Sequence, residues 1–145
     1  MPRSKIFLPD VNVWLALASR RHVHHRTTAA WLDTVGEGQA AFCRVTQMGL
    51  LRLLTNRHAM GDDLVNQSEA WRVYRRMAAD PRIPFLAEPA GIEPAWQRLT
   101  QLHAAAARLW TDAYLQAFAE LKDLQVVSFD RDFLRFPAPP ALILK

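Results

Sequence analysis

Short apolar segments typical of buried β-strands alternate along the chain with segments of helical periodicity. We expect strands over residues 5–8, 40–43, 85–86, 125–129 and 141–144. Helices are expected over residues 11–18, 27–35, 46–54, 67–80 and 111–121, with one more inside 91–103. Strands that alternate with helices form parallel sheets whose two faces are both covered. The order of the segments therefore predicts an α/β fold with a central, mainly parallel sheet.

The length and composition are those of one folded domain. The chain has 145 residues, half of them hydrophobic, so we expect residues 1–145 to form a single domain with a substantial core. The only apolar run near the start, residues 6–8, is too short for a signal peptide or a membrane span. The single cysteine, Cys43, lies in an apolar run and suits a reducing compartment. We expect a cytoplasmic protein with no membrane partner.

The charge balance gives weaker information. Lys and Arg number 18 against 14 Asp and Glu, a net charge of +4 that suits a polyanion but is common in other proteins too. Several scattered basic residues are candidates for contact with nucleic-acid phosphate, or equally for a solvated surface: Arg44, Arg52, Arg57 and Arg131. Composition alone does not decide whether the partner is a nucleic acid.

Three aspartates occupy positions where parallel sheets bind ligands. Asp10 follows the strand at residues 6–8, Asp130 follows the strand at 126–128, and Asp112 opens the helix at 111–121. Strand ends and helix starts share one rim of such a sheet. Each aspartate alone has an ordinary explanation: Asp10 as a helix cap, Asp112 as a complement to a helix dipole and Asp130 as a turn residue. Three carboxylates at one rim repel one another unless a cation neutralises them, and carboxylate oxygens are preferred ligands of Mg²⁺ and Mn²⁺.

A divalent-metal site of this kind can hydrolyse a phosphodiester without a nucleophile from the protein. Other common catalytic arrangements are missing from the sequence, which has no P-loop, no paired zinc cysteines and no serine nucleophile elbow. Metal-assisted hydrolysis is therefore the predicted chemistry.

Four sequence motifs carry a family resemblance. They are LPDVNVW at residues 8–14, VTQMGLLRLLTN at 45–56, WTDAYL at 110–115 and SFDRDF at 128–133. In this order they resemble the PIN-domain ribonuclease toxins called VapC, the toxic half of type II VapBC toxin–antitoxin pairs. The resemblance implies an α/β/α sandwich and a Mg²⁺-dependent endoribonuclease, with Mn²⁺ as a possible substitute. It also implies a cognate VapB-type antitoxin and a homodimer.

The resemblance also implies roles for individual residues. The metal-coordinating acids are Asp10, Asp112 and Asp130, and Asp132 is an auxiliary catalytic acid. Polar residues expected to support the site are Asn12, Gln47, Thr111 and Ser128. One departure concerns Gln47, because many PIN domains have a glutamate where this chain has a neutral amide. Asp132 either compensates for the missing charge or is only a turn residue.

Two other functions are compatible with part of the pattern. A phosphoryl-accepting receiver domain is also a small α/β protein with an acidic rim, but its acid follows the middle strand, where this chain has Arg44 and Val45. A catalytically weak or inactive PIN-like module that binds RNA or acts as a scaffold is the second alternative. Gln47 is its only positive indication, and the three aspartates argue against it.

Overall fold

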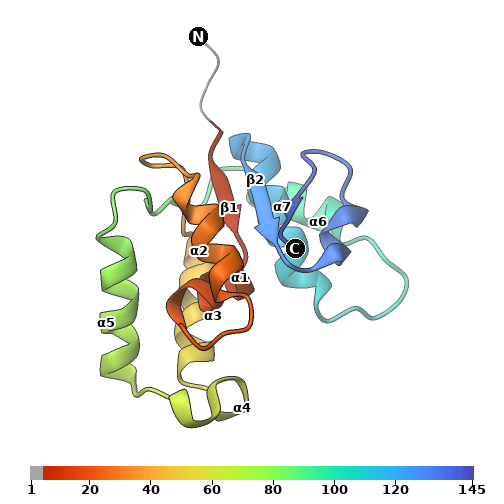
Figure 1. The fold of residues 1–145 in the computed structure, drawn as a ribbon. Helices are drawn as coiled ribbons and strands as arrows, with labels where there is room; N and C mark the ends of the chain where they lie inside the picture. Colours follow the sequence, from red (N-terminus) through yellow and green to blue (C-terminus); the bar gives the residue numbers. More distant parts are fainter. Residues whose placement is uncertain (1–4) are drawn as a thin grey trace.

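The computed structural model describes residues 5–145 and shows a parallel sheet between two helical layers (Figure 1). Strands β1 (Phe7–Pro9), β2 (Gln125–Ser128) and β3 (Leu142–Ile143) are adjacent in that order, and both pairings are parallel. In the register of the sheet, Leu8 lies opposite Val126 and Val127 lies opposite Leu142. The parallel sheet predicted from the alternation of segments is confirmed.

Two of the expected strands are reduced to single-residue bridges. Ala40 forms a parallel bridge with Phe7, and Phe42 forms one with Phe85, so the sheet continues beyond β1. The backbone amide of Phe42 donates to the carbonyl of Pro84 at 2.9 Å. The return bond runs from the Leu86 amide to the Phe42 carbonyl at 2.8 Å. Because proline has no amide hydrogen, Pro84 cannot donate the next bond of this ladder, which stays short at this edge.

Seven α-helices and two short 3₁₀ helices are formed by the described residues. The α-helices are α1 (Val11–Ala18), α2 (His25–Asp33), α3 (Arg44–Leu54), α4 (Arg57–Met60), α5 (Gln67–Ala78), α6 (Ile92–Leu99) and α7 (Leu109–Lys122). The 3₁₀ helices are η1 (Gly61–Asp63) and η2 (Arg131–Arg135). Helices α4, η1 and η2 were not predicted, because segments this short show no hydrophobic periodicity. Within residues 5–145 no helix has the length and apolar character needed to span a lipid bilayer.

The helix starts follow capping chemistry only in part. Helix α5 begins where the sequence predicts, because the side chain of Asn66 accepts a hydrogen bond from the Glu69 amide at 2.9 Å. Helix α2 begins before the expected cap Thr27, and the residue at its N-cap, His24, makes no side-chain capping bond. Its start is instead tied to α1, since the ring of His25 hydrogen-bonds the Ala16 carbonyl at 2.8 Å. A tertiary contact thus places this helix end.

The core is divided by the sheet into two layers. Val126 and Val127 are both fully buried, and because neighbours in a strand point to opposite faces, each belongs to a different core cluster. Val126 packs with residues of α7 such as Phe118. Val127 belongs to the cluster that contains Trp14 of α1, whose ring stacks on Phe42 at 3.9 Å between centroids. Helices therefore cover both faces, and the expected α/β/α sandwich is confirmed.

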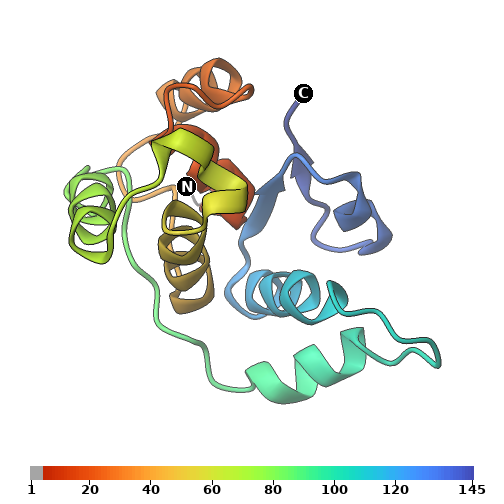
Figure 2. The same ribbon diagram turned by 90° about the horizontal axis from the view of Figure 1, so that it is seen from below.

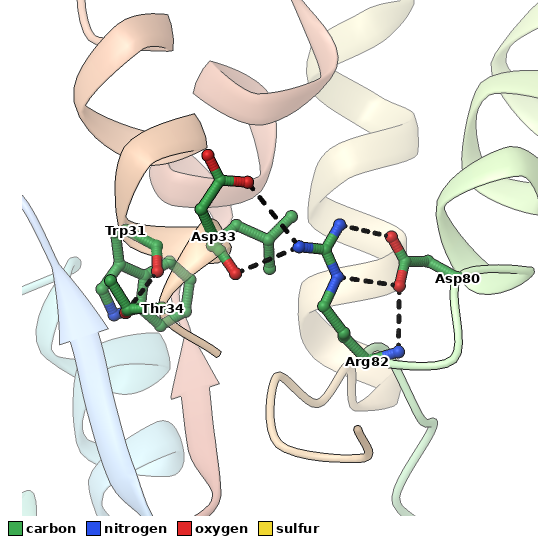
Figure 3. A network of polar contacts seen from close by, with 6 residues as sticks. Trp31, Asp33, Thr34, Asp80 and Arg82 are labelled. Atoms are coloured by element: carbon green, nitrogen blue, oxygen red, sulfur yellow. Dashed lines mark hydrogen bonds and ion pairs between the residues drawn. The ribbon is translucent and has the colours of Figure 1, made fainter. Parts of the chain in front are cut away.

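Arg82 joins the end of α2 to the segment after α5 (Figure 3). Its guanidinium donates two hydrogen bonds to the Asp80 carboxylate, at 3.0 and 2.7 Å, and one to the Leu32 carbonyl at 3.1 Å. The Asp33 carboxylate lies 3.9 Å away. Because the Arg82 carbonyl accepts the Ala40 amide at 2.9 Å, this cluster also fixes the edge of the sheet.

Replacing Arg82 is therefore expected to destabilise the protein. Arg82→Ala should lower the free energy of unfolding by about 1–2 kcal/mol, because it removes a two-pronged carboxylate contact and a bond to a helix carbonyl. Arg82→Lys keeps the charge but not the planar fork, and should recover only part of the loss. Urea denaturation measures the effect. Arg76→Ala, an exposed arginine on α5, is the matched control, and equal losses in both alanine variants would contradict this role.

Candidate active site

The three aspartates predicted from separate parts of the sequence line one cavity. Asp10, Asp112 and Asp130 surround a pocket of about 500 Å³ at the carboxyl ends of β1 and β2. The remaining walls come from the first turn of α1, from α3 and from the start of α7. Figure 2 shows the backbones of α3 and α7, the two helices whose side chains contribute to this lining. The structure thus brings together all three acids at the expected rim.

Asp10 is held in place by neutral donors. It is the N-cap of α1, and its Oδ1 accepts hydrogen bonds from the amides of Asn12 at 3.0 Å and Val13 at 3.3 Å. Its Oδ2 accepts a hydrogen bond from the Ser128 hydroxyl. Burial nevertheless raises the pKa of Asp10 to about 6, against the lowering effect of these bonds, and the negative charge of Asp112 adds to the rise. The capping role and the site role therefore coexist in one side chain.

Ser128 links two of the acids. Its hydroxyl is fully buried, donates to Asp10 and accepts a hydrogen bond from the Asp130 amide at 2.9 Å. The carboxylate of Asp130 in turn accepts the Asp132 amide at 2.8 Å and so caps the start of η2. Ser128, which the sequence predicts as a supporting residue, thus fixes the ends of β1 and β2 relative to each other.

Asp112 lies in the first turn of α7 and interacts with several charged side chains. Burial is the main cause that raises its pKa, and the charges of Asp130 and Asp132 raise it further. Arg135 acts in the opposite direction, because its Nη2 donates to Oδ2 of Asp112 at 3.2 Å. Asp132 is exposed and does not line the pocket, so its contribution in the described structure is the field it exerts on Asp112.

Two of the expected supporting residues, Asn12 and Thr111, line the pocket, whereas Gln47 does not. The buried Gln47 side chain accepts a hydrogen bond from Arg44 instead.

Gly49 is a residue of α3 that lines the pocket near the acids, because side chains two positions apart on a helix point in nearly opposite directions. A Cβ on Gly49 would overlap a methyl group of Val11, so glycine lets α1 approach α3 closely. A glycine inside an otherwise apolar helix is the sequence signal that could have indicated this contact.

Two arginines share the pocket with the acids. Arg52 projects from α3, and Arg108 immediately precedes α7. Both are exposed, and among the residues that the structure describes neither has a carboxylate oxygen within 4.0 Å. The sequence identifies Arg52 only as one of several scattered basic residues and gives no indication for Arg108.

The donor set fits a hard divalent cation in its chemistry. Carboxylate oxygens are the ligands Mg²⁺ and Mn²⁺ prefer. Burial raises the pKa of Asp10 and of Asp112, and a bound cation would stabilise their charged forms. Within residues 5–145, however, no three acidic, histidine or cysteine side chains form a ready-made ligand cluster. The carboxylates of Asp112 and Asp130 are engaged by Arg135 and by an amide. They would have to turn towards the ion.

Comparison with known proteins identifies the family. The family model described as PIN domain matches residues 7–139. Ribonuclease VapC41 of Mycobacterium tuberculosis is 43% identical over 136 residues, which span 90% of this chain and 93% of that protein. The chain belongs to the VapC family of PIN-domain proteins. The resemblance inferred from the four motifs is confirmed.

Solved structures share the architecture of this VapC-family chain. The toxin VapC20 of M. tuberculosis, described as cleaving the sarcin-ricin loop, superposes with a TM-score of 0.68 at 16% identity, over 96% of this chain and 99% of that one. A toxin–antitoxin complex from Klebsiella pneumoniae gives 0.62 at 21% identity, over 92% and 93% of the two chains. At these identities the likeness shows the PIN fold alone.

The buried charge of Asp10 leads to a pH-dependent prediction for the metal-free VapC-family protein. The pKa of Asp10 is about 6 in the folded protein against an ordinary value of 3.8, so the folded state binds more protons between these values. The contribution of Asp10 to stability is therefore lost as pH rises from about 4 to 6, by up to about 3 kcal/mol. Asp10→Asn carries no such charge, so its free energy of unfolding should rise relative to that of the wild type as pH increases over this window. Urea denaturation with EDTA at pH 4.5, 6 and 8 measures the difference.

Mn²⁺ provides the control for this prediction. The ion should stabilise the wild type at pH 7.5 and leave Asp10→Asn nearly unchanged, because binding to the folded state alone raises stability. A stability difference between the two proteins that does not vary with pH would contradict the assigned burial of charge.

Proposed function

We propose that this protein is a metal-dependent endoribonuclease and the toxin of a type II toxin–antitoxin pair. The observation that carries the proposal is the convergence of Asp10, Asp112 and Asp130 on one pocket that also contains Arg52 and Arg108. Such a pocket offers oxygen ligands to a cation and positive charge to a phosphate. The 43% identity to a protein named as a ribonuclease, over 90% of the chain, supports the same activity.

The acids of the pocket would hold the cation, and neighbouring polar groups orient them. Asp10, Asp112 and Asp130 would hold Mg²⁺ or Mn²⁺, which when bound supplies Lewis acidity to a phosphodiester and to an attacking water. The α1 amides and the Ser128 hydroxyl fix the orientation of Asp10, so that this ligand needs no reorganisation. Asp132 adds negative charge beside Asp112 and strengthens attraction of a cation.

Arg52 and Arg108 are suited to bind the phosphates of the substrate. They line the pocket from two different elements, since Arg52 lies on α3 and Arg108 directly precedes α7. Phosphate contacts position a nucleic acid without reading its sequence. The preference for RNA over DNA rests on the names of the relatives, since carboxylate–metal hydrolysis makes no use of the 2′-hydroxyl group.

We also propose a cognate VapB-type antitoxin and a homodimeric assembly. The antitoxin is supported by the similar fold of a solved toxin–antitoxin complex. The homodimer rests on the family resemblance of the sequence. Sedimentation velocity of the protein alone and with the antitoxin tests both assignments.

Cleavage of a structured RNA pool tests the activity. The wild type should cut RNA with Mn²⁺ or Mg²⁺ and not with EDTA. Asp10→Asn and Asp112→Asn should each lower the rate by about 100-fold or more, because each removes a ligand charge from the cation. The matched control is Asp123→Asn at the far end of α7, where the backbone has a positive φ of 55° that asparagine tolerates.

The outcomes of this assay separate the two functions considered for the chain. Cutting by Asp112→Asn at the rate of the Asp123→Asn control would show that the site is assigned incorrectly. RNA binding with no cutting by the wild type under any metal would favour the non-catalytic module.

The dependence of RNA affinity on salt tests the two arginines separately from catalysis. In EDTA, where no cutting is expected, Arg52→Gln and Arg108→Gln should each reduce the slope of log affinity against log salt by about 0.7 for a single strand. Fluorescence anisotropy with a labelled RNA measures the slope. Arg72→Gln on the exposed face of α5 removes the same charge and should leave the slope nearly unchanged. Equal slopes for all three variants would exclude a phosphate contact in the pocket.

A further inference from the structure

Asp112 is the one pocket acid that is paired with a cation among residues 5–145. Nη2 of Arg135 lies 3.2 Å from Oδ2 of Asp112, and the contact is both an ion pair and a hydrogen bond. Asp10 and Asp130, by contrast, are held by amides and a hydroxyl group. Arg135 therefore occupies, in the protein without metal, the carboxylate that the proposed function assigns to the cation.

The backbone around Arg135 is anchored while its side chain is accessible. Arg135 ends η2, the short helix that begins directly after Asp130. Phe133 and Phe136 on either side of it are buried in the core under α7. The guanidinium lies over the Phe136 ring, 5.4 Å from its centroid, and the side chain remains 39% exposed. The backbone of Arg135 is thus fixed by its buried neighbours, whereas its guanidinium group is accessible to solvent.

The contact itself is of the kind that a stronger cation displaces. A single guanidinium nitrogen reaches a single carboxylate oxygen, whereas strong arginine–carboxylate pairs use two parallel bonds. Solvent screens a partly exposed pair, so its net strength is small. A divalent ion carries twice the charge of the guanidinium and is held at the same time by neighbouring carboxylates. An arginine beside such an ion would also be repelled by it.

We propose that Arg135 is an exchangeable counter-cation of the site, which neutralises Asp112 in the metal-free protein and gives up this carboxylate when a divalent cation binds. The inference rests on the proposed metal site and adds a residue that sets its affinity. In this arrangement the metal-free protein avoids part of the repulsion between Asp112 and the charges of Asp130 and Asp132. The metal then binds in competition with an internal cation.

A different role for Arg135 predicts the opposite sign. If the arginine kept its bond while Asp112 ligated the ion, it would orient the ligand, and loss of such an orienting partner weakens metal binding. If Arg135 exchanges with the ion, its loss strengthens metal binding. The direction of the change in affinity therefore distinguishes the two roles.

Titration calorimetry with Mn²⁺ and no RNA is the first test. Arg135→Gln should bind Mn²⁺ about two- to fivefold more tightly than Arg131→Gln, which is the gain expected from removing a partly exposed ion pair. Arg131→Gln is the matched control, because Arg131 lies in the same short helix, is exposed and has no carboxylate within 4.0 Å among the described residues. Arg135→Lys keeps a competing charge and should return the affinity towards the wild-type value.

A stability measurement supplies a second readout. Without metal, Arg135→Gln should unfold at lower urea concentration than Arg131→Gln, because Asp112 loses its partner. Saturating Mn²⁺ should remove this gap, since the wild type no longer uses the ion pair. In an Asp112→Asn background, Arg135→Gln should have no larger effect than Arg131→Gln. A purely structural role for Arg135 would leave the gap in place with Mn²⁺ and with Asp112→Asn.

The wild type itself provides a readout that does not depend on the folding of a variant. The side-chain NMR signal of Arg135, assigned from Arg135→Lys, should shift on addition of Mg²⁺, whereas that of Arg131 should not. Equal or weaker Mn²⁺ binding by Arg135→Gln, or an unshifted Arg135 signal at saturating Mg²⁺, would overturn the exchange. Absence of Mn²⁺ binding to every variant and to the wild type would instead overturn the proposed metal site.

Discussion

The buried hydrogen bond from Ser128 to Asp10 is the interaction on which the geometry of the site depends. It joins the carboxyl ends of β1 and β2, and the same hydroxyl accepts the amide of Asp130. Asp10 in turn caps α1, so the direction of that helix is tied to the same carboxylate. Sheet, helix and candidate ligand are therefore fixed by one polar cluster inside an otherwise apolar core.

The burial of Asp10 lowers the stability of the protein but places a carboxylate where the proposed function needs one. Two amides and a hydroxyl group satisfy the oxygens of Asp10, yet burial still raises its pKa to about 6. A carboxyl group with such a pKa is mostly ionised at neutral pH and carries a desolvation cost that its hydrogen bonds do not offset. A cation in the pocket would remove this cost. The proposed activity explains why a charged residue occupies a position that a neutral cap could fill.

Much of the fold and half of the site follow from local sequence patterns. The strand ends predict Asp10 and Asp130, and the start of a periodic helix predicts Asp112, because the direction of parallel strands places all three at one rim. Gln47 does not line the pocket, and its supporting role stays a prediction, because which residues of α3 face the acids depends on the rotation of that helix about its axis. That rotation is set by the contact of Gly49 with Val11, which lies in another helix. Arg135 could not be assigned because its partner, Asp112, is distant in the sequence. Arg108 could not be assigned because its place in the pocket depends on how α7 packs beside the acids.

The arginines show how the protein distributes positive charge around an acidic pocket. Arg135 is paired with a pocket carboxylate, whereas Arg52 and Arg108 line the pocket without such a pair in the described part of the chain. If all three were paired with the acids, no carboxylate would be open to a cation and no guanidinium to a phosphate. If none were paired, the repulsion among the carboxylates would be larger still. With one arginine paired and two unpaired, two of the pocket carboxylates have no cationic partner among the described residues, and two guanidinium groups are open to a polyanion.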